Sequence, residues 1–267
     1  MQVLPDVQAY ADSRNLKIDK VGVTQVPWPF RFSPTSKATE LAQSTVGSVD
    51  MFVTLPADKK GTHMSRFVQL LRDCDQTFHY ENLIIFFRQL QERLGASQVS
   101  GTLRFPFFME RSAPVTGELG KLQIQVAIDI ELGEKSTLRT TIKGPATSLC
   151  PCSKEISAYG AHNQRCELSA SVVFEEGCEV GVDELFEMIE KAASCSVYPT
   201  LKRTDEKSVT EAAYDNPKFV EDIVRDMAVI LKEDSRIAWF RCGSENFESI
   251  HQHNAFAQIE FSRSNGQ

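Results

Sequence analysis

Two cysteines flank a proline in the segment Cys150-Pro151-Cys152, and His162 follows ten residues after the second cysteine. Thiolate and imidazole groups are ligands that suit a borderline-soft divalent metal such as zinc. The spacing differs from that of zinc fingers and zinc ribbons, so a closed structural site with four ligands is not expected. The alternative is a pair of small buried thiols and a hydrogen-bonded core histidine.

A second candidate segment, Leu201–Lys207, combines basic and acidic residues directly after Tyr198-Pro199. Basic side chains bind phosphate groups well, and a carboxylate can complete a metal site. The alternative is a charged loop exposed to solvent. The charged residues of this segment are Lys202, Arg203, Lys207, Asp205 and Glu206.

Glu221 lies at the border of the apolar face of a helix expected to begin at Asn216-Pro217. A carboxylate in this place can accept two N–H groups from the Watson–Crick edge of guanine. The same pair rejects adenine, which presents an acceptor at one of those positions. The alternative is a half-exposed surface glutamate.

Two of the five histidines occur close together, as His251-Gln252-His253. In a strand, alternate side chains share one face, so both imidazoles would point the same way. They would then serve metal binding or proton transfer near neutral pH. The alternative is an exposed loop.

The segment Gly61–Arg66 is expected to open a helix, with Thr62 as its cap. Free backbone N–H groups at a helix N-terminus attract phosphate, and Arg66 would add charge. His63 and Ser65 lie in the same turn. The alternative is an ordinary capped helix without a ligand.

Composition limits the classes of protein that need consideration. The chain has 267 residues, 42% hydrophobic residues and a net charge of −7, as expected of a soluble globular protein. An acidic chain is a poor candidate for binding nucleic acid, and no apolar stretch reaches the roughly 20 residues that span a bilayer. No signal peptide is evident, and the seven cysteines are scattered, which favours reduced thiols in the cytoplasm.

The hydrophobic pattern predicts an α+β fold with mainly antiparallel sheet. Each half of the chain has the order strand, strand, helix, helix, strand, strand. In the first half, strands are expected at 20–26, 49–55, 99–108 and 122–132, helices at 62–74 and 83–94, and a long loop at 28–46.

In the second half, the two cysteines are expected on a constrained loop after a strand at 137–142, which a hairpin turn at 133–135 introduces. We expect a peripheral segment at 1–16 and two units at 17–145 and 146–267, the second carrying most catalytic residues. The other expected elements are strands at 166–174, 236–242 and 255–261, and helices at 183–195 and from 216 onwards.

Taken together, the candidate segments resemble the type IB GTP cyclohydrolases, the prokaryotic branch of that activity. The resemblance covers about residues 60–253, and its matching segments are 61–67, 148–165, 201–207, 214–222 and 242–253. It implies a tunnelling fold with two tandem ββααββ units. It also implies a homotetramer in which the active sites lie at subunit interfaces.

The resemblance further implies a hydrolase that converts GTP and water to 7,8-dihydroneopterin triphosphate and formate. This is the first step of folate biosynthesis and, in some bacteria, of deazaguanine tRNA modification. By resemblance, a divalent metal (zinc, iron(II) or manganese) would be held by Cys150, His162 and Glu206. Cys152 would be the catalytic thiol and Glu221 the guanine anchor. His251 or His253 would transfer protons, and the basic and hydroxyl residues named above would contact the substrate.

Two rival functions remain at this point. A nitrile reductase of the same fold uses a cysteine to form a thioimide and would explain Cys152, but it has no need of a metal at Cys150 and His162. A non-catalytic, metal-stabilised binding module would need a closed site with four ligands.

Overall fold

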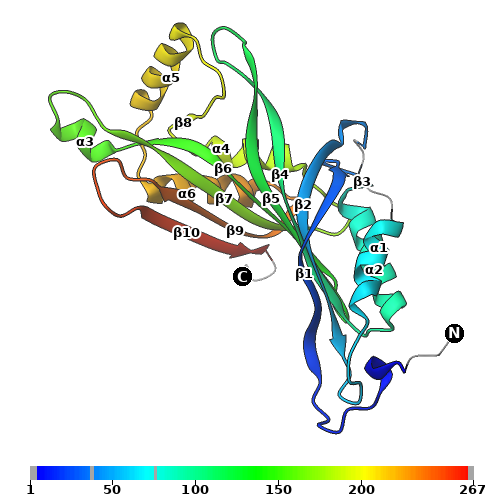
Figure 1. Ribbon diagram of the computed structural model, residues 1–267. Helices are drawn as coiled ribbons and strands as arrows, with labels where there is room; N and C mark the ends of the chain where they lie inside the picture. The colour runs from blue at the N-terminus through cyan, green and yellow to red at the C-terminus, as the bar shows by residue number, and fades with distance from the viewer. Residues whose placement is uncertain (1–4, 37–38, 75–76, 264–267) are drawn as a thin grey trace. The chain divides into compact units, whose positions relative to one another are not determined.

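The computed structural model describes residues 5–36, 39–74 and 77–263, so residues 1–4 of the expected peripheral segment lie outside it. Helices lie between groups of long, mainly antiparallel strands along the chain (Figure 1). The strands are β1 (Ile18–Phe32), β2 (Gln43–Leu55), β3 (Thr77–Phe78), β4 (Val99–Ser112), β5 (Leu119–Leu132), β6 (Thr137–Leu149), β7 (Asn163–Phe174), β8 (Cys195–Ser196), β9 (Ile237–Asn246) and β10 (Ala255–Ser262). The α-helices are α1 (Met64–Asp73), α2 (Tyr80–Leu94), α3 (Pro151–Ile156), α4 (Val182–Glu190), α5 (Arg203–Asp215) and α6 (Val220–Glu233), and short 3₁₀ helices occupy Val7–Ala9 and Thr39–Leu41.

The chain forms two compact units. The first contains Met1–Phe105 and Ala127–Leu138, and the second contains Pro106–Val126 and Arg139–Gln267. Strands β4 and β5 contribute residues to both units. The expected boundary between two repeat units at residues 145 and 146 concerns the tandem repeat and stays a prediction.

In the first unit, the strands pair in the order β3-β1-β2-β4. β2 is antiparallel to β1 and β4, whereas the short β3 is parallel to β1. Helices α1 and α2 pack beside these strands (Figure 1). Aromatic side chains fill the core, and the rings of Phe30 and Phe105 meet edge to face with centroids 5.3 Å apart. As expected, α2 ends at Gly95, whose φ of 59° is left-handed and favours glycine.

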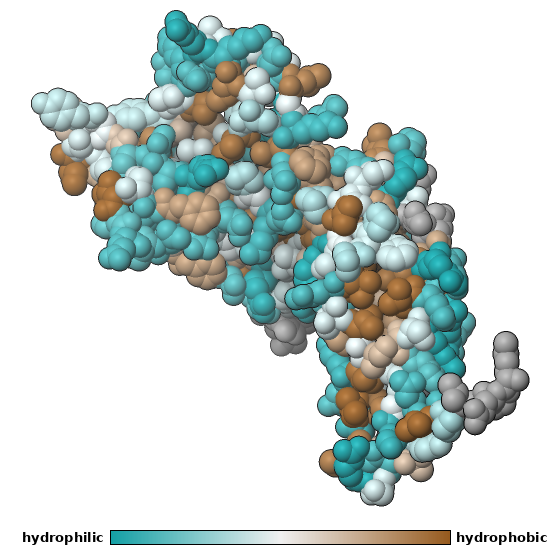
Figure 2. Space-filling model, viewed as in Figure 1, coloured by the Kyte–Doolittle hydropathy of each residue, from teal (hydrophilic) through white to brown (hydrophobic). Residues whose placement is uncertain are grey.

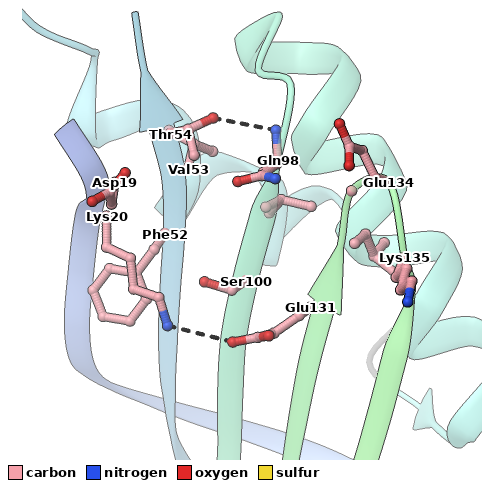
Figure 3. Close-up of a pocket in the computed structure, with 13 residues that line it drawn as sticks. Asp19, Lys20, Phe52, Val53, Thr54, Gln98, Ser100, Glu131, Glu134 and Lys135 are labelled. Atoms are coloured by element: carbon pink, nitrogen blue, oxygen red, sulfur yellow. Dashed lines mark hydrogen bonds and ion pairs between the residues drawn. The ribbon is translucent and has the colours of Figure 1, made fainter. Parts of the chain in front are cut away.

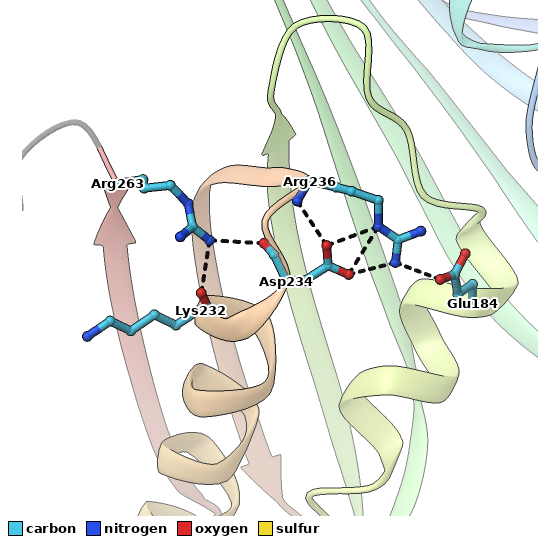
Figure 4. A network of polar contacts seen from close by, with 5 residues as sticks. All are labelled: Glu184, Lys232, Asp234, Arg236 and Arg263. Atoms are coloured by element: carbon cyan, nitrogen blue, oxygen red, sulfur yellow. Dashed lines mark hydrogen bonds and ion pairs between the residues drawn. The ribbon is translucent and has the colours of Figure 1, made fainter.

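In the second unit, the strands pair in the order β5-β6-β7-β9-β10, and β8 pairs with β6. Helices α4 and α6 pack together and cover β7, β9 and β10. A Cβ at Gly144 would lie 2.3 Å from the ring of Phe186, so glycine lets α4 approach β6 closely. Figure 4 shows how the end of α6 is fixed: both carboxylate oxygens of Asp234 accept bonds from Arg236, which also reaches Glu184 at 2.7 Å.

Several expected boundaries were wrong. The expected loop at 28–46 is shorter, because β1 continues to Phe32 and β2 begins at Gln43. Phe30 and Phe32 are buried, and this burial outweighs the prolines that suggested a loop. The cap of α1 is His63 and not Thr62, and α4 ends at Glu190.

The region 201–219 also differs from expectation. Residues Arg203–Asp215 form a helix, α5, in which only Asp205 and Ala213 are buried. So few apolar contacts leave no helical periodicity to detect in the sequence. Asn216 ends α5, and α6 begins at Val220 with Phe219 as its N-cap. The second half thus adds α3, β8 and α5 to the expected order of elements.

Candidate active site

Two of the predicted metal ligands, Cys150 and His162, lie at the two ends of one closed loop. β6 runs to Leu149, so Cys150 follows the strand directly and is the N-cap of the short helix α3. The N–H of Cys150 donates to the carbonyl oxygen of His162 at 3.2 Å. The hydroxyl of Ser153 donates to the carbonyl of Cys150 at 3.1 Å and accepts the N–H of His162 at 3.2 Å. The loop therefore brings the backbones of Cys150 and His162 together.

Hydrogen bonds also orient the imidazole of His162. Its Nδ1 lies 2.9 Å from Oε1 of Gln164 and 3.1 Å from Oγ of Ser249. Nε2 of Gln164 donates to Glu248 at 3.2 Å, which leaves Oε1 as the amide's acceptor. Nδ1 therefore carries the proton, and the lone pair of Nε2 is available to a metal. The sequence showed no signal for the role of Gln164.

Cys150 and His162 have the donor chemistry of a zinc-type site, and Cys150 is half-buried while Cys152 is exposed. Glu206 is exposed in the first turn of α5. Within residues 5–36, 39–74 and 77–263, no three His, Cys, Asp or Glu side chains gather closely enough to hold a metal. Backbone hydrogen bonding thus joins two of the three predicted ligands, and Glu206 completes no group of three with them in the described part of the chain.

Asp205, beside Glu206, was not singled out from the sequence as a functional residue. Its side chain is buried and accepts hydrogen bonds from Val115, Thr116 and Lys202. Burial raises the pKa of this carboxyl, but the hydrogen bonds together outweigh burial and lower it. Asp205 lies three positions after the N-cap, Lys202, but lysine is not one of the usual capping residues, so the sequence lacks the ordinary capping signal here.

The predicted guanine anchor, Glu221, is exposed in the first turn of α6. The segment before this helix is tied to the end of β6: the N–H of Lys218 donates to the carbonyl of Leu149 at 3.0 Å, and Ser148 donates to the carbonyl of Lys218 at 3.2 Å. These two hydrogen bonds link the segment before α6 to the end of β6, which Cys150 follows directly.

Two of the three predicted basic residues at the start of α5 have carboxylate partners. Nζ of Lys202 lies 2.6 Å from Glu118, and Nζ of Lys207 lies 3.8 Å from Glu211. Arg203 is exposed. Pairs this exposed contribute little to stability, so both lysines can exchange their partners for a phosphate group at small cost.

His251 and His253 lie in the exposed loop between β9 and β10 and not in a strand. Their rings are nevertheless stacked, with centroids 5.2 Å apart and planes 13° apart.

The remaining predicted residues, His63, Ser65 and Arg66, are in the first unit at the start of α1. Nε2 of His63 lies 3.2 Å from Asp6, and His63 and Arg66 line a depression of about 240 Å³ together with Lys59. A larger depression of about 480 Å³ contains the Lys20–Glu131 ion pair but none of the predicted site residues (Figure 3).

Surface hydrophobicity does not distinguish the site. Figure 2 shows polar and apolar residues interspersed over the visible face. Exposed apolar side chains occur in both units, such as Val46 in β2 and Ile156 in α3. In addition, no helix of the described residues combines the length and the hydrophobicity that crossing a membrane requires.

Solved structures show the fold of the chain. A uricase from Arthrobacter globiformis aligns over 93% of this chain and 95% of its own with a TM-score of 0.55 and 10% identity. A urate oxidase from Bacillus subtilis 168 aligns over 92% of this chain and all of its own with a TM-score of 0.52 and 10% identity. At this identity the likeness concerns the fold alone, and it confirms the expected α+β tunnelling fold.

Sequence comparisons show the family. The GTP cyclohydrolase FolE2 of Magnetococcus marinus is 47% identical over 258 residues, which cover 96% of both chains. That of Aromatoleum aromaticum is 44% identical over 259 residues, which cover 96% of this chain and 93% of its own. The model of type I GTP cyclohydrolase folE2 matches residues 4–257. The chain therefore belongs to the type I GTP cyclohydrolase folE2 family.

Proposed function

We propose that this chain is a GTP cyclohydrolase that hydrolyses the imidazole ring of GTP at C8 and forms 7,8-dihydroneopterin triphosphate and formate. The observation that carries the proposal is the match to one family from residue 4 to residue 257, which includes every predicted site residue. We assign the chain to the type IB branch of this activity. Its product would enter folate biosynthesis and, in some bacteria, deazaguanine tRNA modification.

The proposed cofactor is a divalent metal held by Cys150, His162 and Glu206. The free lone pair on Nε2 of His162 and the closed loop between the first two residues support this ligand set. Zinc, iron(II) and manganese all suit such donors. When bound, the metal would supply Lewis-acid chemistry at the attacked carbon.

The other predicted residues would act on the substrate directly. The carboxylate of Glu221 accepts the ring N–H and the exocyclic amine of guanine, and the exposed thiol of Cys152 is free to react. His251 or His253 exchanges protons with the ribose during its opening. The triphosphate contacts are His63, Ser65, Arg66, Lys202, Arg203 and Lys207.

We further propose a homotetramer in the cytoplasm with active sites that straddle subunits. Cys152 and Cys178 keep exposed free thiols, which fits a reducing compartment. Mixing an Arg66→Ala protein with a Cys152→Ser protein is expected to restore part of the activity, because one intact site can form from two defective subunits. A fully active monomer in analytical sedimentation would refute this assembly.

The decisive experiment incubates the purified protein with GTP and a divalent metal and looks for a fluorescent pterin after oxidation. Formate should appear in equal amount, ATP should give neither product, and a chelator should abolish both. A protein that binds GTP but releases no pterin would refute the activity. The same result would favour a binding module, and NADPH-dependent reduction of a nitrile would favour the rival reductase.

Guanine selection is tested with Glu221→Gln. The variant loses charge-assisted hydrogen bonds of roughly 1.5–3 kcal/mol each, so the Michaelis constant for GTP should rise steeply while the fold is retained. Glu233→Gln, at the other end of the same helix, is a matched control. Equal affinity of the wild-type protein for GTP and ATP would contradict the assignment.

A further inference from the structure

Asp205 holds two separate parts of the second unit together. Its Oδ1 accepts the backbone N–H groups of Val115 and Thr116, both at 2.9 Å. Its Oδ2 accepts the hydroxyl of Thr116 at 2.7 Å and the N–H of Lys202 at 3.0 Å. The side chain is fully buried, so four donors from two segments converge on one carboxylate without competition from water.

The segment that Asp205 reaches is the turn between β4 and β5, which lies beside α5 in Figure 1. This turn is closed on itself: the N–H of Ala113 donates to Glu118 at 2.9 Å, and that of Gly117 donates to Ala113 at 3.1 Å. Gly117 has a φ of 68°, which glycine adopts without strain. Its own backbone hydrogen bonds therefore fix the conformation of this turn.

Two further contacts join the same two segments. Nζ of Lys202 pairs with Glu118 at 2.6 Å. A Cβ at Gly120 would come within 2.9 Å of the ring of Pro199, so glycine allows the chain entering α5 to lie directly against the start of β5. Asp205 thus lies at the buried centre of the contact between two segments: Pro199 to the first turn of α5, and the β4–β5 turn with the start of β5.

We propose that Asp205 is a positioning residue for the reaction: by fixing the first turn of α5 on the β4–β5 turn, it sets the place of Glu206 and of the basic residues beside it. The inference rests on the proposed function, in which Glu206 is a metal ligand. Glu206 is itself exposed, so the buried anchor of its turn is the neighbouring carboxylate. When a group that orients a metal ligand is mutated, metal affinity or activity commonly falls by roughly 10–100-fold.

The arrangement requires a carboxylate and not an amide. Four N–H or O–H donors meet two acceptor oxygens. An asparagine offers one acceptor oxygen, and its NH₂ group would face at least one donor. Asp205→Asn keeps the volume of the side chain but leaves the N–H of Lys202 or the bonds to the β4–β5 turn unsatisfied.

The test compares Asp205→Asn with Asp234→Asn. Both substitutions remove a hydrogen-bonded carboxylate from the second unit, but Asp234 serves Arg236 at the start of β9 and not α5. For each variant, manganese(II) affinity is measured by electron paramagnetic resonance, turnover by pterin formation and protection of residues 203–209 by hydrogen exchange. Asp205→Asn should lose roughly 10–100-fold in metal affinity and kcat, with faster exchange in α5. Asp234→Asn should lose thermal stability alone.

Two variants of Thr116 keep the proposal testable if Asp205→Asn fails to fold. Thr116→Val removes one donor to Asp205 and should weaken metal binding in the same direction, whereas Thr116→Ser keeps the hydroxyl and should restore it. If Asp205→Asn matches Asp234→Asn in metal affinity and kcat while the wild-type protein is active, the positioning role is wrong and the proposed function stands. If the wild-type protein neither binds the metal nor converts GTP, the proposed function fails and the positioning role fails with it.

Discussion

The backbone N–H of Cys150 donates to the carbonyl oxygen of His162 at 3.2 Å, which joins two residues that the sequence separates by a helix and a turn. Cys152 lies between them in the chain but is exposed in α3. The two cysteines therefore occupy different surroundings although one proline alone separates them. This difference supports different tasks for the two thiols.

Cys150→Ala should lower the metal content of the purified protein and its turnover together. The substitution removes the thiolate, which is the softest of the three proposed ligands. Metal content is measured by atomic emission after gel filtration. Full occupancy and full rate in this variant would show that Cys150 is not a ligand.

Cys152→Ser should abolish most of the turnover while metal content, fold and GTP affinity remain close to wild type. A thiol bound to a metal is a poor nucleophile, so one cysteine cannot easily be ligand and reactive group together. Pre-steady-state kinetics and metal analysis of one preparation check both points. Loss of the metal in Cys152→Ser, or an unchanged rate, would contradict this division.

Gln164→Leu should weaken metal binding by roughly 10–100-fold, because the Nδ1–H of His162 loses its amide acceptor and keeps the hydroxyl of Ser249 alone, which fixes the tautomer less firmly. Gln164→Glu keeps an acceptor and should bind the metal better than Gln164→Leu. Gln125→Leu, an exposed position on β5, is the control for a change from glutamine to leucine. Equal metal affinity in all of these variants would show that Gln164 does not orient His162.

Alkylation should distinguish the exposed thiols from the buried ones. Burial raises the pKa of Cys166 to about 12 and that of Cys242 to about 11, so neither forms thiolate near neutral pH. Iodoacetamide should therefore modify Cys152 and Cys178, which are exposed, before these two, as peptide mass spectrometry can show. Inactivation should persist in Cys178→Ser and slow in the presence of GTP. Early modification of Cys166 would contradict the assignment.

Asp234→Asn should destabilise the protein at neutral pH but not in acid. Hydrogen bonds from Arg236 lower the pKa of this carboxyl below its ordinary value of 3.8. A lowered folded-state pKa contributes stability that is present above the unfolded pKa and is lost as the pH falls through the folded one. Because Arg236 is partly exposed, we expect a loss of about 1 kcal/mol. Urea unfolding of the wild-type protein and of Asp234→Asn, at neutral pH and in acid, checks this. A difference in unfolding free energy between the two that grows in acid would contradict it.

The sequence alone determined those elements whose side chains repeat with a strong period. The alternation in β5 and the three-to-four spacing in α2, ended by Gly95, were both confirmed because burial on one face produces such patterns directly. The order of elements in the first half was also confirmed, apart from the short β3. The segments that resemble the family were found by residue type and spacing, and family membership was confirmed.

Only the tertiary structure decided which partners these segments have. α5 escaped detection because it buries almost no apolar surface and is held by polar contacts instead. The partner of Asp205 is Thr116, 89 residues earlier in the chain, and the partner of Ser249 is His162, 87 residues earlier. Hydrogen bonds of this range depend on the path of the whole chain, and local periodicity carries no record of them. The spacing of Cys150, Cys152 and His162 predicted the chemistry, whereas the folded loop decided which nitrogen of His162 is left free.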